Sequence, residues 1–324
     1  MFGQHSLPSR RTGRLLIALA AVLWSTSGFF VKAPLFSGWP GPLLACWRAL
    51  FACLVLIPMV RRPRWTWRLL PMVTFFIAMN WFYLSALVKT EASIAIWLQY
   101  TAPVWVFFVC VFVWREPVHR RDWVLLACAA AGVGLILAFE LRGESAAGVI
   151  FGLLSGLTFA GILLSLRWLR AEDPAWLVAL NHLAAAAALS PYIAWYPQCW
   201  PTGLQWAFVC GLGVLQMGLP YLLFAQGLKS VPGHEASGIA LLEPVLVPVW
   251  VFVAWHGADN YLAPRWWTLA GGALILSGLL LRYIGQRDPP ALGQDDEQPR
   301  SETEQRNSNR THRPDDRAKP AQRD

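Results

Sequence analysis

The sequence predicts an all-α integral membrane protein with ten transmembrane helices, arranged as two inverted five-helix repeats. Apolar residues make up 56% of the 324 residues and charged residues only 14%, far below the roughly 25% charged content of soluble domains. Ten apolar segments of about 20 residues follow one another, and each can cross a hydrocarbon core about 30 Å thick. Matching features also recur in the two halves of the chain, which indicates a repeat.

The first apolar segment follows three arginines, Arg10, Arg11 and Arg14, as a secretory signal would. Its apolar run is longer than a signal sequence needs and further spans follow, so we predict a retained helix. The ten predicted spans are residues 15–35, 42–60, 68–88, 92–114, 122–139, 147–168, 175–196, 204–228, 233–255 and 266–284.

The Lys and Arg residues of the loops predict the orientation. Counting alternate loops places thirteen of them on the side of both termini and three, Lys89, Arg142 and Arg265, on the other. Positive loops stay in the cytoplasm, so we predict a multi-pass protein of the cytoplasmic membrane with both termini inside. The predicted parts are a cytoplasmic N-terminal segment (1–12), a first five-helix repeat (13–141), a second (146–285) and a disordered cytoplasmic tail (286–324).

The repeat is clearest in the fourth span of each half. The stretch SALVKTEASIAIWLQYTAPVW (85–105) matches QGLKSVPGHEASGIALLEPVL (226–246) at an offset of 141, which pairs Pro103 with Pro244. Because each half holds an odd number of spans, the second half enters the membrane with the opposite polarity. Inverted repeats are the plan of many secondary transporters, with the substrate site near the midplane between the halves.

Cofactor and metal motifs are absent from the sequence. No CxxC, HExxH or GxxxxGK[ST] pattern occurs, and the six cysteines form no disulfide framework. We therefore expect no metal and no cofactor. The basic residues lie in short clusters between apolar runs, which favours a role in membrane orientation and argues against a nucleic-acid partner.

Five stretches follow one another in a characteristic order: LWSTSGFFVK (23–32), LLACWRAL (43–50), QYTAPVWVFFVCVFVWRE (99–116), LLEPV (241–245) and AGGALILSGLLL (270–281). In this order they resemble the EamA-like ten-helix permeases of the drug/metabolite transporter superfamily. One departure is WHGAD (255–259), where the family usually places Gly-Glu, so the role of Glu116 is not transferred to that loop. The resemblance implies a central cavity enclosed by helices 1–4 and 6–9, with helices 5 and 10 outside it.

Two charged residues are the strongest candidates for substrate binding or coupling, because ionisable groups inside a bilayer are costly. Glu243 lies near mid-depth of the ninth span, where it can bind a cationic group or carry a coupling proton; a packing role is the alternative. Arg48 lies in the second span and offers a planar fork for an anionic group, or it reaches the outer headgroups.

Several neutral residues are further candidates. His182 in the seventh span can relay protons or form a hydrogen bond between helices. The side chains of Asn80, Gln99 and Tyr100 can face a cavity or hold helices together. The rings of Trp24 and Tyr221 can form the wall of a cavity.

The paired prolines, Pro103 and Pro244, lie in corresponding helices and predict a kink in each. They are either a hinge for alternating access or static bends.

The predicted function is a secondary transporter that moves a small organic metabolite, such as an amino acid or an amphipathic drug-like compound. We expect alternating access, export, and coupling to protons. We expect no enzyme; the alternatives are a membrane-embedded transferase and a non-transporting receptor or channel. The glycine-rich fifth and tenth helices can pack in the monomer or in a homodimer.

Overall fold

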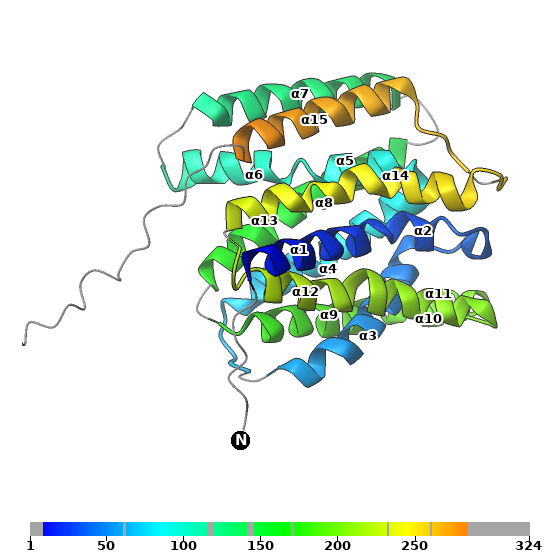
Figure 1. The fold of residues 1–324 in the computed structure, drawn as a ribbon. Helices are drawn as coiled ribbons and strands as arrows, with labels where there is room; N and C mark the ends of the chain where they lie inside the picture. Colours follow the sequence, from blue (N-terminus) through cyan, green and yellow to red (C-terminus); the bar gives the residue numbers. More distant parts are fainter. Residues whose placement is uncertain are drawn as a thin grey trace, which may run out of the picture. The chain divides into compact units, whose positions relative to one another are not determined.

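The computed structural model describes residues 9–60, 63–115, 120–140, 146–169, 172–231, 233–259 and 261–283, and every structural statement below concerns these residues. All regular elements in them are helical (Figure 1). The predicted disordered tail and Glu116 lie outside the described residues.

The first half contains five apolar helical segments that run along the bundle (Figure 1). Its helices are α1 (Arg10–Ser25), α2 (Ser27–Val31), α3 (Gly41–Leu56), α4 (Leu69–Lys89), α5 (Ala92–Gln99), α6 (Ala102–Phe108) and α7 (Arg120–Glu140). Short 3₁₀ turns lie at Pro34–Phe36 and Ile57–Met59, and a π-helical turn, Val109–Val113, follows α6.

The second half also contains five such segments. Its helices are α8 (Ala146–Trp168), α9 (Pro174–Leu189), α10 (Pro191–Trp195), α11 (Leu204–Gly213), α12 (Leu219–Gly227), α13 (Gly233–Ala240), α14 (Leu242–Trp255) and α15 (Trp266–Tyr283). A 3₁₀ turn lies at Pro197–Cys199, and a π-helical turn, Val214–Gly218, joins α11 to α12.

The predicted membrane fold is confirmed. Nine helical segments in the described part of the chain are long and apolar enough to cross a membrane, and a tenth, Trp266–Leu281, is shorter but also apolar. Successive segments alternate in direction, so α1 starts at one end of the bundle and α8 at the opposite end (Figure 1). We call these ends the α1-start end and the α8-start end.

The fourth span of each half is broken rather than kinked. The first break separates α5 from α6 at Tyr100 and Thr101, and the second separates α13 from α14 at Leu241. The predicted kinks at interior prolines therefore require correction, because Pro103 and Pro244 lie in the first turn after each break. A proline costs little there, since the amide it lacks has no helical acceptor.

The most extensive packing joins helices of different halves. Helix α4 packs along α8, α7 along α15, α3 against α9 and α1 against α12. Helices α7 and α15 lie side by side at the edge of the bundle (Figure 1). They approach closely because Gly132 and Gly271 meet there: a Cβ atom built on Gly132 would lie 2.4 Å from the carbonyl oxygen of Gly271.

Candidate functional site

A cavity of about 280 Å³ lies among the helices of both halves. Six of the residues predicted for the site line it: Trp24, Arg48, Gln99, Tyr100, Tyr221 and Glu243. The structure therefore brings together side chains from α1, α3, α12 and the two broken spans. We call this space the central cavity.

Glu243 reaches the central cavity from the first turn of α14, immediately after the break at Leu241. The Tyr100 hydroxyl donates to its Oε2 atom across 2.9 Å, and the same hydroxyl lies 3.3 Å from the carbonyl oxygen of Ala240. The two breaks thus face each other, one supplying the donor and the other the carboxylate. The positive end of the α14 dipole also favours a negative charge at this position.

Arg48 is fully buried on α3, which excludes the predicted alternative that its side chain reaches the headgroups. Its Nη2 donates to Oδ1 of Asn80, and the guanidinium lies over the Tyr83 ring, 5.8 Å from the ring centroid. Its Nε and Nη1 find no acceptor among the described residues. A buried donor without a partner costs about 1–3 kcal/mol, so these groups are suited to an anionic ligand group.

Asn80 supports this arginine rather than lining the cavity. Its amide nitrogen donates to the carbonyl oxygen of Phe76 across 3.0 Å, which orients the amide oxygen toward Arg48. The side chain is fully buried, so its role is to position the guanidinium.

His182 also lies outside the cavity wall. Its ring is fully buried and packs edge-on against Phe76 at 4.8 Å and near Tyr221 at 6.2 Å, measured between ring centroids. Both ring nitrogens lack a hydrogen-bond partner among the described residues. The interhelical hydrogen bond predicted for His182 is therefore not formed with any described residue. The proton relay stays a prediction.

Aromatic and amide side chains complete the wall. Trp24 packs against Tyr221 with 5.3 Å between ring centroids, and Gln99 donates to the sulfur of Met79 across 3.3 Å. Gln216, from the π-helical turn, donates to the carbonyl oxygen of Trp24 across 3.1 Å. The turn thus directs an amide to the C-terminal end of α1.

Sequence reasoning missed Tyr83 as a site residue. Tyr83 lines the cavity and exchanges a hydrogen bond of 2.9 Å with Ser27. It lies three residues after Asn80 on α4, and this spacing places both on one face of the helix, so it could have been found. The apolar wall residues, such as Phe159 and Phe224, carry no signal that separates them from lipid-facing positions.

Two cationic side chains outside the central cavity, Lys32 and Arg167, make different contacts. Lys32 donates to the carbonyl oxygen of Thr90 across 2.6 Å at the α8-start end. Arg167, at the other end of α8, lies over the Trp114 ring, 4.7 Å from its centroid. Within the described part of the chain, no group of three or more His, Cys, Asp or Glu side chains gathers as a metal site.

The central cavity therefore presents unlike charges in a largely apolar setting. Arg48 and Glu243 line the same small space and attract each other electrostatically. No ion pair within 4.0 Å joins them in the described residues. Such an arrangement can hold a solute with an anionic and a cationic group, or exchange a proton at the carboxylate.

Comparison with known proteins agrees with this architecture. The family model described as the EamA-like transporter family matches residues 11–138 and 146–284. A protein from Archaeoglobus fulgidus named "Uncharacterized transporter" is 31% identical over 278 residues, covering 84% of this chain and 97% of that protein. "Uncharacterized transporter YxxF" of Bacillus subtilis is 25% identical, covering 69% of this chain and 73% of that protein.

One solved crystal structure has the same fold. It superposes with a TM-score of 0.61 at 21% identity and covers 85% of this chain and 98% of its own chain. With both halves of the chain matched by the family model and nearly the full length of a transporter relative aligned, this protein belongs to the EamA-like transporter family.

Proposed function

We propose that the protein is a secondary transporter that exports a small amphipathic organic molecule bearing both an acidic and an amino group, such as an amino acid. The observation that supports this is the placement of Arg48 and Glu243 on one cavity of about 280 Å³. A cavity of this volume favours a small solute.

In this proposal the unpartnered nitrogens of Arg48 bind the acidic group of the solute. Arginine suits this role because its planar fork matches a carboxylate. Glu243 binds the amino group, and Trp24 and Tyr221 cover the apolar part. When the solute binds, its amino group replaces the Tyr100 hydroxyl as the hydrogen-bond donor to Glu243.

Proton coupling follows from competition at Glu243. A carboxylate binds an ammonium group only when it is ionised, so arrival of a proton releases the solute. The breaks at Tyr100–Thr101 and Leu241 provide the hinges for alternating access, with Pro103 and Pro244 fixing the start of each moving segment. Both termini lie in the cytoplasm in this proposal, since the positive loops share their side.

The test begins with a thermal-shift screen of amino acids, nucleosides, sugars and amine drugs on detergent-purified protein, followed by flux of the stabilising compounds in proteoliposomes. We expect stabilising compounds to carry both an acidic and an amino group. Glu243→Gln should leave the protein folded and abolish the dependence of flux on an imposed pH gradient. Glu235→Gln, at the α1-start end, is the matched control and should retain that dependence.

Two results would contradict the proposal. One is a Glu243→Gln variant whose gradient-driven flux equals that of the wild type. The other is a set of stabilising compounds that lack a charged group, because such compounds need neither Arg48 nor Glu243.

A further inference from the structure

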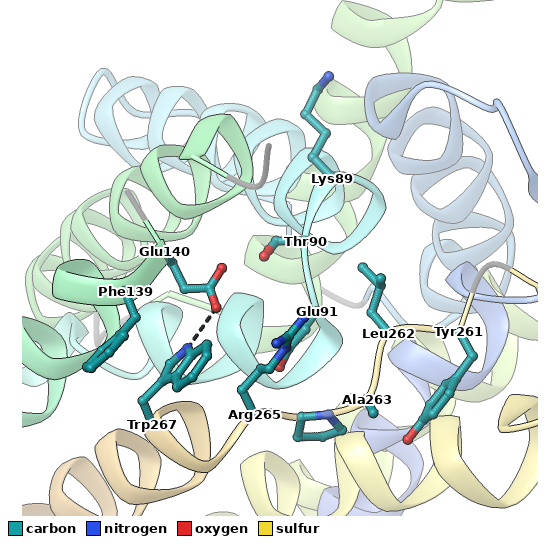
Figure 2. A pocket seen from close by; sticks show the side chains of 11 residues that line it. Lys89, Thr90, Glu91, Phe139, Glu140, Tyr261, Leu262, Ala263, Arg265 and Trp267 are labelled. Carbon is teal, nitrogen blue, oxygen red and sulfur yellow. Dashed lines mark hydrogen bonds between the residues drawn. The ribbon is translucent and has the colours of Figure 1, made fainter. Parts of the chain in front are cut away.

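A second, larger cavity of about 870 Å³ lies at the α8-start end of the bundle. Its wall is formed by the turn between α4 and α5, the last residues of α7 and the segment that leads into α15 (Figure 2). No described residue lines both this cavity and the central cavity. We call it the end cavity.

Glu91 is a buried carboxylate on the wall of the end cavity, with only 7% of its surface exposed. It immediately precedes α5, and the Ser93 hydroxyl donates to its Oε2 across 3.2 Å. The hydroxyl of Thr268 is also buried and forms no hydrogen bond with the described residues. Among the described residues no cationic side chain lies within 4.0 Å of this carboxylate.

Glu140 supplies a second carboxylate from the last position of α7. The indole nitrogen of Trp267 donates to its Oε1 across 2.8 Å, and Figure 2 shows this bond beside the cavity. Glu140 is near enough to Glu91 that their charges repel each other. Burial, together with this repulsion, raises the pKa of Glu91 to about 7. A cation between the two carboxylates would relieve the repulsion.

Among the described residues, the positive side chains around the cavity make contacts other than an ion pair with Glu91. The Arg265 guanidinium lies over the Trp267 ring, 5.5 Å from its centroid. Lys32 donates to the backbone of Thr90, and Lys89 extends away from the two carboxylates (Figure 2). Lys32 also attracts Glu91 electrostatically.

Thr90 gives a separate indication of a ligand. Its side chain is fully buried, it lies on the wall of the end cavity, and its Oγ1 has no hydrogen-bond partner among the described residues. A buried hydroxyl without a partner is costly, and a ligand N–H group would satisfy it. The ring of Tyr261 lines the same cavity and offers a face that attracts cations.

We propose that the end cavity is a second binding site, separate from the central cavity, that takes the ammonium group of a small organic amine between Glu91 and Glu140. The Thr90 hydroxyl accepts one N–H, and the Tyr261 ring contacts the carbon skeleton. A Ca²⁺ ion fits less well, because it requires 6–8 oxygen ligands and the described wall supplies two carboxylates. The site is independent of which solute the central cavity carries.

The test measures binding to the full-length detergent-purified protein by isothermal titration calorimetry at pH 8. The probes are phenethylamine, its neutral analogue 2-phenylethanol, and CaCl₂. All variants are made in a Glu243→Gln background, which removes the carboxylate of the central cavity. We expect phenethylamine to bind in this background and the alcohol and Ca²⁺ to bind at least tenfold more weakly.

Adding Glu140→Gln or Glu91→Gln should weaken the binding of phenethylamine at least tenfold, while adding Glu235→Gln should leave its affinity unchanged. In the Glu140→Gln variant the new amide oxygen can still accept from Trp267, so that variant should fold if the Glu91 variant does not. The proposal is overturned if Glu243→Gln alone abolishes binding, if the alcohol or Ca²⁺ binds as well as the amine, if no probe binds, or if the carboxylate variants bind normally.

Discussion

The contact between Gly132 of α7 and Gly271 of α15 supports a quantitative prediction about packing. A Cβ atom on Gly132 would lie 2.4 Å from the Gly271 carbonyl oxygen and 2.9 Å from a side-chain carbon of Ile275. Since Cβ atoms essentially never approach heavy atoms below 3.0 Å, the backbones must separate by at least 0.6 Å. The obstacle is backbone, so no side-chain rotation relieves it.

Gly134 is a matched control on the same helix. A Cβ atom there meets no atom of the described residues within 4 Å, so Gly134→Ala changes helix propensity without changing packing. Both alanine substitutions increase helix propensity by the same amount, about 1 kcal/mol at most. This gain cancels when the stabilities of the two variants are compared. What remains is the overpacking cost at Gly132, about 2 kcal/mol within a usual range of about 1–3.

The measurement is the unfolding temperature of the two purified variants in one detergent. At about 2.1 cal/mol/K of unfolding entropy per residue, a difference of about 2 kcal/mol corresponds to about 3 °C for a chain of 324 residues. We expect Gly132→Ala to unfold at the lower temperature. Equal unfolding temperatures, or a less stable Gly134→Ala, would show that α7 and α15 do not meet as described.

Two further predictions concern pH. Arg10 and Arg14 donate to Glu235 and lower the pKa of this carboxyl below its ordinary value of 4.5. The stability from these ion pairs is therefore present above pH 4.5 and lost as the pH falls through the lowered pKa. Thermal melts should show the wild type losing its advantage over Glu235→Gln in acid, and a constant difference would contradict this. For Glu91 the pH dependence of stability has the opposite sign, because its pKa is raised from 4.5 to about 7. Stability should decline as the pH rises between these two values, by at most about 3 kcal/mol. Glu91→Gln should remove that decline, whereas an unchanged slope would place its origin elsewhere.

The sequence repeat indicated where the fourth spans are interrupted, but it did not indicate that the interruptions are breaks. An offset of 141 relates the ends of α5 and α13, Gln99 and Ala240, as well as the paired prolines. The pattern predicted a kink because proline was read as interrupting a helix. The structure shows that the helix has already ended, which proline at the first turn permits.

The candidate site was predictable only where a single residue carried the signal. Charges inside apolar spans identified Glu243 and Arg48, because burying them is costly in any fold. The contact of Tyr100 with Glu243 was not predictable, since it depends on how the two breaks face each other across the halves. Glu91 was missed for a related reason: it lies in a turn, and only the packing of α7 and α15 brings Glu140 and Trp267 beside it.

The pairing of helices across the halves has a consequence for how the protein is made. The chain is synthesised from its N-terminus, so α1, α3, α4 and α7 enter the membrane before their partners α12, α9, α8 and α15 exist. Until then Gly132 lacks the helix against which it packs. Assembly therefore waits for the last helix to emerge, and a chain stopped after Glu140 is an unfinished intermediate rather than a smaller transporter.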